Sequence, residues 1–142
     1  MKNINIYLTF NGNCEKAFNL YKDVFGGEFT NFSRFKEMPP PEDNSFSIPE
    51  DQLERIMHVS LQINDNIILM GSDTGGEWGK GFKEGNNFSI SIDSDSKNEA
   101  DLIFKKLSEG GKITMPQSDT FWGSYFGSLI DQFGVNWMVS YG

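Results

Sequence analysis

The sequence predicts an α+β fold built from two tandem modules, each with the element order strand, helix and three strands. Three observations lead to this prediction. Short runs alternate between apolar and polar residues, as strands do. Two longer segments carry apolar residues at the period of a helix. A pair of glycines follows each of these predicted helices. Because one such module leaves a sheet face uncovered, we expect the two copies to share a core or a cleft.

The first module is expected to span residues 1–72. Its predicted helix carries an apolar stripe and stops at Gly26 and Gly27, and the turn-forming 64–66 joins its last two strands. A Pro-rich, acidic stretch without periodicity is predicted to be a long loop. The expected elements are, in chain order, a strand at 3–10, a helix at 14–25, a strand at 28–35, a loop at 36–54 and strands at 55–63 and 67–72.

A glycine-rich linker over 73–86 joins this module to the second one, which spans 87–142, and the whole of 1–142 forms one domain. The glycines of the 73–86 segment precede a strand and not a helix, so a flexible linker is favoured over a phosphate-binding loop. We expect Asp95 or Ser96 to cap the second helix. The expected elements are a strand at 86–93, a helix at 94–109, a short strand at 112–116 and strands at 122–130 and 135–142.

The composition excludes several classes of partner. The formal net charge is −8 and no Lys/Arg cluster is present, so neither nucleic acid nor an anionic membrane surface is an expected partner. No apolar run is long enough to span a membrane. Cys14 is the single cysteine, which fits a reducing, cytoplasmic location. Its place at a helix start permits a reactive thiol, but we favour a structural role, since no histidine lies nearby in the sequence.

Three stretches carry a resemblance to a known family: FNGNCEKAFNLYKDVFGGEF, MHVSLQINDNIILMGSD and, most specifically, SDTFWGSYFGSLIDQFGVNWMV. They resemble the PhnB-like branch of the vicinal oxygen chelate superfamily, which includes glyoxalase I, bleomycin-resistance proteins and extradiol dioxygenases. The resemblance implies two βαβββ modules that form a shared half-barrel cleft. Relatives often carry the name 3-demethylubiquinone-9 3-methyltransferase. No residue supports methyl transfer here, since a glycine-rich loop between strand and helix is lacking.

Metal-dependent members of this superfamily take His, Gln or Glu ligands from inward positions of paired strands. Carried over to this sequence, those positions fall at Ile6, Phe88 and Met138, and at Leu69 or Met70. None of these side chains suits a hard or borderline metal. If the carried-over positions were shifted by one residue along their strands, another set of side chains would face the site, and that set still does not provide three strong ligands. These alternative residues are Asn5, Tyr7, Asn87, Ser89 and Trp137. We therefore expect no metal and no cofactor.

Three residues are candidates for acid–base chemistry. His58, the only histidine, lies on the third predicted strand of the first module, where a structural role is favoured over an acid–base role and where no other metal ligand accompanies it. Asp73 and Asp119 are the carboxylates nearest the ends of strands that should border the cleft. For both, the alternative is capping or turn formation.

Apolar residues at the metal positions predict an aromatic cleft that binds a small, flat or amphipathic molecule. For Phe10 we favour the alternative of a core position. Two functions follow: a metal-independent small-molecule binding protein, which we favour, or a glyoxalase- or dioxygenase-type enzyme. A homodimer is expected because incomplete four-stranded sheets leave edges that invite pairing. The candidate ligand-binding residues are Tyr7, Phe10, His58, Trp122, Tyr125, Trp137 and Met138.

Overall fold

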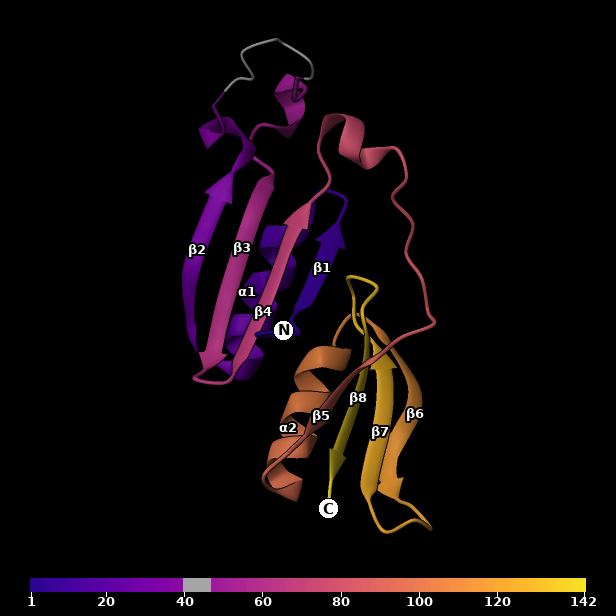
Figure 1. Ribbon diagram of the computed structural model, residues 1–142. Helices are drawn as coiled ribbons and strands as arrows, with labels where there is room; N and C mark the ends of the chain where they lie inside the picture. The colour runs from indigo at the N-terminus through magenta and orange to yellow at the C-terminus, as the bar shows by residue number, and fades with distance from the viewer. Residues whose placement is uncertain (40–46) are drawn as a thin grey trace. The chain divides into compact units, whose positions relative to one another are not determined.

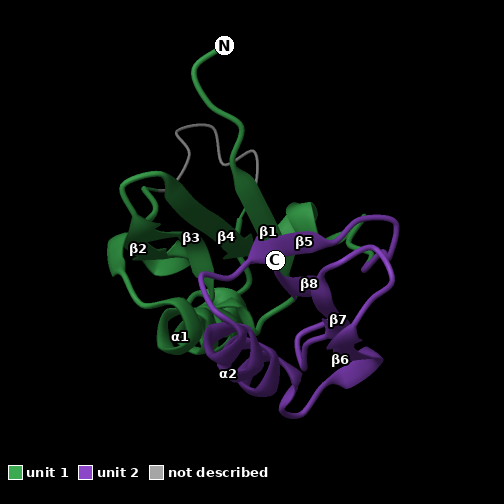
Figure 2. Cartoon of the chain, turned by 90° about the horizontal axis from the view of Figure 1, so that it is seen from below, with its two compact units in different colours: residues 1–83 green, residues 84–142 purple. Residues whose placement is uncertain are grey.

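The computed structural model describes residues 1–39 and 47–142, so residues 40–46 of the predicted loop lie outside the described residues. The chain divides into two compact units, unit 1 at 1–83 and unit 2 at 84–142 (Figures 1 and 2). The division falls within the predicted linker. In the described part of the chain, each unit has one α-helix and one open four-stranded sheet, and neither sheet closes into a barrel. The predicted α+β fold with two βαβββ copies is therefore confirmed.

Unit 1 has the strand order β1-β4-β3-β2, in which β1 runs parallel to β4 and the other neighbours are antiparallel. Of three short 3₁₀ turns, η2 and η3 lie in the segments predicted as loop and linker, and η1 begins at the last residue of the strand predicted at 28–35. The elements are β1 Ile6–Phe10, α1 Cys14–Phe25, β2 Glu28–Arg34, η1 Phe35–Glu37, η2 Glu50–Gln52, β3 Ile56–Asn64, β4 Ile67–Asp73 and η3 Gly76–Gly79.

Helix α1 packs on one face of the unit 1 sheet through the apolar stripe that the sequence predicts. Ala17, Phe18 and Tyr21 are fully buried there. The Phe18 ring lies so close to β4 that a Cβ at Gly71 would be 2.7 Å from it and 2.7 Å from the Leu8 carbonyl oxygen. A side chain at position 71 would therefore push the helix from the sheet. The helix ends at the predicted glycine pair, where Gly26 has a φ of 76°.

The carboxylate of Asp73 holds one end of unit 1 together. Its Oδ1 accepts hydrogen bonds from the backbone N–H groups of Gly12 (2.8 Å) and Cys14 (3.0 Å), and its Oδ2 accepts one from Ile56 N–H (2.9 Å). The side chain of Asn13, the N-cap residue, makes no capping hydrogen bond. Asp73, at the end of β4, therefore supplies the cap of α1 from a distant part of the sequence and also fixes the start of β3.

Unit 2 repeats the architecture with the strand order β5-β8-β7-β6 and β5 parallel to β8. Ser96 caps α2 by accepting a hydrogen bond from Glu99 N–H at 3.0 Å, as one of the two predicted capping residues. Four apolar residues of α2 are buried: Ala100, Ile103, Phe104 and Leu107. The elements are β5 Ile90–Asp93, α2 Lys97–Ser108, β6 Lys112–Asp119, β7 Tyr125–Ile130 and β8 Asn136–Tyr141.

A second buried carboxylate, that of Asp131, organises the turn between β7 and β8. Its Oδ1 accepts hydrogen bonds from Phe133 N–H (2.8 Å) and Val135 N–H (3.1 Å). Its Oδ2 accepts one from the indole Nε1–H of Trp137 at 2.8 Å. The turn thereby fixes a large buried side chain in the core of unit 2.

The two parallel strands are shorter than predicted. The strand expected at 3–10 begins at Ile6, and the one expected at 86–93 begins at Ile90. Each of these strands lies at the edge of its sheet and has a single neighbour, β4 or β8. A strand extends only as far as paired backbone groups on its neighbour continue, and residue composition does not report where that pairing starts.

Strands β6 and β7 also differ from the prediction. The strand expected at 112–116 continues to Asp119 along β7, and the one expected at 122–130 begins at Tyr125. The intervening segment is a turn in which Gly123 has a φ of 93°. Pro116 lies within β6, an edge strand, where a missing N–H is tolerated. Among the described residues, no helix is long and apolar enough to cross a membrane.

Replacing Asp73 with alanine should destabilise the protein strongly. The change leaves three backbone N–H groups at the ends of α1 and β3 without their acceptor, and Asp73 is only 4% exposed. We expect a loss of about 3 kcal/mol in the free energy of unfolding, measured by urea denaturation. Asp119→Ala, at an exposed strand end, is the control and should change stability by less than about 0.5 kcal/mol. Equal effects of the two changes would refute the role of Asp73.

Candidate functional site

Each sheet has one face that its helix covers and a second face, called here the far face. In unit 1, Leu8, Val59 and Leu69 are buried toward α1. Since side chains alternate along a strand, their neighbours in sequence point to the far face. The far face of unit 1 therefore carries a mainly polar set: Tyr7, Thr9, His58, Ser60, Met70 and Ser72.

The predicted residues Tyr7 and His58 meet on this far face. The hydroxyl of Tyr7 lies 3.5 Å from His58 Nδ1, and the two ring centroids are 5.8 Å apart. On the other side of the imidazole, Nε2 lies 3.0 Å from the Ser60 hydroxyl. Hydroxyl groups can donate or accept, so this row accommodates either neutral tautomer of the histidine. Both ring nitrogens face hydroxyl groups of the same sheet.

A cavity of about 310 Å³ lies at one end of the far face of unit 1 and is called here the aromatic cavity. Phe35 in η1 is 3% exposed and stacks against Trp78 in η3, with ring centroids 5.9 Å apart and an angle of 27° between the planes. A Cβ at Gly75 would lie 2.6 Å from the Phe35 ring, so the glycine permits this packing. The cavity is lined by Thr9, Phe35, Met57, Ser72, Thr74 and Trp78, together with Asp73.

Two of the candidate site residues of unit 1, Phe10 and Asp73, have structural roles. Phe10 is 3% exposed and its ring packs edge-on against Phe18, in the core beneath α1. Asp73 lines the aromatic cavity, but both of its carboxylate oxygens accept the backbone hydrogen bonds described above. The structure thus places Phe10 in the core position that the sequence favours and gives Asp73 a capping role.

Two aromatic candidates of unit 2 point toward α2. Trp137 is 2% exposed and held by Asp131. The hydroxyl of Tyr125 donates to Asp101 Oδ1 on α2 at 2.5 Å, and Lys97 Nζ lies 4.5 Å from its ring centroid. The hydrogen bond to Asp101 raises the pKa of Tyr125 above its usual value. Both side chains are therefore engaged on the helix side of their sheet.

The remaining candidates of unit 2 lie elsewhere. Met138 alternates with Trp137 and so belongs to the far face of unit 2. Trp122, which is 56% exposed, lies in the turn before β7 and contacts the rings of Phe121 and Phe126. Asp119 is exposed at the end of β6.

Strand register also changes two of the positions carried over for metal ligands. Ile6 alternates with Tyr7, so Tyr7 and not Ile6 occupies the far face of unit 1. Phe88 lies outside β5, which begins at Ile90, and the far-face residues of that strand are Ser91 and Asp93. In the described parts of the chain, no three or more His, Cys, Asp or Glu side chains are placed to hold a metal ion.

Sequence reasoning missed the aromatic cavity because two of its aromatic residues lie in segments assigned to a strand end and a linker. Phe35 ends the predicted second strand, and Trp78 stands among glycines in the predicted linker. Met57, the third apolar residue, belongs to a strand. A tryptophan within a glycine-rich stretch was the available signal, since such a residue is seldom placed in a flexible linker without a packing partner.

The model of the 3-demethylubiquinone-9 3-methyltransferase family matches residues 2–140. The chain belongs to this family. Protein YjdN of Escherichia coli (strain K12) is 33% identical over 138 residues, which cover 94% of this chain and 91% of that protein. The crystal structure of PA1353 from Pseudomonas aeruginosa is 37% identical, with a TM-score of 0.84 over 99% of this chain and 98% of that one. The predicted branch is therefore confirmed.

The fold is that of the glyoxalase/bleomycin resistance/dioxygenase superfamily. A crystal structure of an enzyme of that family from Burkholderia phytofirmans PsJN has a TM-score of 0.60 at 16% identity and covers 95% of both chains. The family name implies S-adenosylmethionine, which the residues do not fit. The turn between β1 and α1 has one glycine, and the N–H groups of Gly12 and Cys14 already donate to Asp73. Neither group is open to a cofactor.

The thiol of Cys14 should be unreactive in the folded protein. Burial raises its pKa far above the usual value, and the nearby carboxylates of Asp73 and Glu15 raise it further. We expect no alkylation by iodoacetamide at about pH 8, and complete alkylation of the urea-unfolded chain, both followed by mass spectrometry. Rapid alkylation of Cys14 in the folded protein would contradict this expectation and would support a reactive thiol at the helix start.

Proposed function

We propose that this protein binds a small, flat or amphipathic molecule without a metal ion, in the aromatic cavity of unit 1. The proposed function is the one expected from the sequence, but none of the predicted ligand-binding residues lines this cavity, which lies within unit 1 alone. Phe35, Met57 and Trp78 supply its apolar wall. A ligand pocket of this kind combines apolar side chains with a few polar groups that orient the ligand.

One observation carries the proposal: Trp78 remains 55% exposed although it stacks on a buried phenylalanine. An indole with that much exposed surface is held in a defined orientation by Phe35, and Gly75 leaves room for the contact. A pre-oriented aromatic surface at a cavity favours a flat ligand, because stacking then costs little conformational entropy.

Three further lining residues supply hydroxyl groups. Thr9 and Ser72 come from the paired strands β1 and β4, and Thr74 follows β4. The Thr74 hydroxyl donates to Asn11 Oδ1 at 2.7 Å and accepts from Arg55 Nη1 at 3.3 Å, so its position at the cavity is fixed by contacts within the protein. The pairing of apolar and hydroxyl walls suits an amphipathic molecule better than a charged one.

Binding without a metal is supported by the chemistry of the far face. His58 has hydroxyl neighbours at both ring nitrogens, whereas a metal ligand leaves one nitrogen for the ion. The alternative is a glyoxalase- or dioxygenase-type enzyme, supported by the fold shared with the Burkholderia phytofirmans enzyme. Such an enzyme needs about three protein donors for its metal. The homodimer and the cytoplasmic location stay predictions.

The role of Trp78 can be tested with 1-naphthol, a flat amphipathic probe, by isothermal titration calorimetry. Trp78→Ala should weaken binding by about tenfold or more, because the stacking surface is lost while the fold is retained. Phe121→Ala removes an exposed aromatic residue of unit 2 and serves as the matched control, with unchanged affinity expected. Failure of the unaltered protein to bind the probe, or equal losses in both variants, would refute the aromatic cavity as the site.

Metal content distinguishes the two functions. We expect the protein purified without chelator to carry no stoichiometric Zn, Ni, Fe or Mn, measured by inductively coupled plasma mass spectrometry. Turnover of the glutathione hemithioacetal should be absent as well, since no metal would stabilise an enediolate. About one metal ion per chain, lost on His58→Ala, would favour the enzyme instead.

A further inference from the structure

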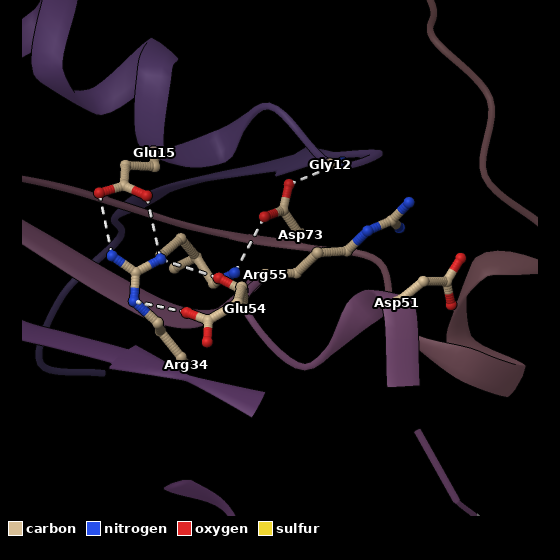
Figure 3. Close-up of a pocket in the computed structure, with 8 residues that line it drawn as sticks. Gly12, Glu15, Arg34, Asp51, Glu54, Arg55 and Asp73 are labelled. Carbon is tan, nitrogen blue, oxygen red and sulfur yellow. Dashed lines mark hydrogen bonds and ion pairs between the residues drawn. The ribbon is translucent and has the colours of Figure 1, made fainter. Parts of the chain in front are cut away.

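Unit 1 contains a second, charged cavity of about 500 Å³, called here the charged cavity. It lies where the turn between β1 and α1 meets the segment leading into β3, as Figure 3 shows. Two arginines and four carboxylates line it. The question is which of these groups the protein already uses for itself and which remain for a ligand.

Most of the charges are paired within the protein. Arg34 donates two hydrogen bonds to the carboxylate of Glu15, at 2.9 and 3.0 Å, and this pairing lowers the pKa of Glu15. Glu54 accepts a hydrogen bond from Lys36 at 2.9 Å and lies 3.8 Å from Arg34 Nε. Asp73 is saturated by backbone N–H groups. Two lining groups remain, Arg55 and Asp51.

Arg55 is anchored through one nitrogen only. Its Nη1 donates to Asn11 Oδ1 (3.2 Å), the Thr74 carbonyl oxygen (3.2 Å) and the Thr74 hydroxyl (3.3 Å). The backbone of Gly12 lies against the guanidinium, since a Cβ there would be 3.4 Å from Nη2. Within the described chain, Nε and Nη2 have no acceptor. These two N–H groups form the side-on edge that binds both oxygens of a carboxylate.

The second unpaired group has the opposite charge. Asp51, in η2, is exposed and accepts no hydrogen bond or ion pair from the described residues. It contributes one wall of the cavity, and Figure 3 shows its carboxylate on the side toward which the Arg55 side chain extends. The chain as a whole has a net charge of −8, so a purely anionic ligand would be repelled. A ligand that also carries a cation avoids this penalty.

The geometry points to a second binding site in the charged cavity, for a small zwitterion of the amino acid class. The Arg55 edge binds the carboxylate, and Asp51 binds the ammonium group. Because the site shares only the saturated Asp73 carboxylate with the aromatic cavity, it stands whether or not the aromatic cavity binds a ligand.

The test uses the full chain and three probes with different charge separations: L-alanine, L-glutamine and γ-aminobutyrate. At least one should shift the backbone amide NMR signals of Gly12, Cys14 and Arg55 in a saturable manner. The N-acetyl derivative and the methyl ester of that probe should each bind about tenfold more weakly or worse, since each lacks one charge. No saturable shift with any probe, or an unchanged affinity of either derivative, would overturn the inference.

Substitutions of Asp51 and Arg55 test which residue binds the ammonium group of the probe and which binds its carboxylate. Asp51→Asn should weaken the best probe about tenfold, while Glu50→Gln, a neighbouring acid outside the cavity lining, should leave its affinity unchanged. Arg55→Lys keeps the charge but removes the two-point edge and should also weaken binding about tenfold. The exposed Asp51 keeps the test valid if the arginine variant is unstable. Equal affinities in Asp51→Asn and the unaltered protein would exclude the proposed ammonium contact.

Discussion

The carboxylate of Asp73 joins three parts of unit 1 that are far apart in the sequence: the end of β4, the start of α1 and the start of β3. A buried carboxylate is costly unless every oxygen is hydrogen-bonded, and here three backbone N–H groups meet that need. The aromatic and charged cavities both border this residue. Gly12 and Ile56, whose N–H groups donate hydrogen bonds to it, line the charged cavity, and Met57 next to Ile56 lines the aromatic one, so part of the site geometry depends on the same interaction as fold stability.

Unit 2 caps its helix in a different way. By strand pairing, Leu69 corresponds to Trp137, so the position of Asp73 corresponds to Tyr141, which cannot cap a helix through a carboxylate. Ser96 caps α2 locally instead. The buried carboxylate of unit 2, Asp131, lies in the turn between β7 and β8 and fixes Trp137. Two copies of one element order thus place their buried charge at different points, and only unit 1 directs it toward the two cavities considered above.

Alternation and residue type predicted part of the far face of unit 1, but not the aromatic cavity at its end. Tyr7 and His58 are polar aromatic residues on predicted strands, and the structure brings them together on one far face. Phe35, Trp78 and Arg55 were not found, because their importance comes from contacts with residues far away in the sequence. Tyr125 was predicted as a ligand-binding residue. In the structure it points toward α2, where its hydroxyl donates a hydrogen bond to the carboxylate of Asp101.

The sequence by itself determined the element order, the repeat and the glycine pair that follows each helix, since periodicity and turn-forming glycines are local properties. Only the tertiary structure decided which face of a strand is covered, as Ile6 and Tyr7 illustrate. It also decided that Asp73 caps a helix 59 residues before it. Strand register and long-range hydrogen bonds depend on which segments meet in space, and a shift of one residue reverses every side chain.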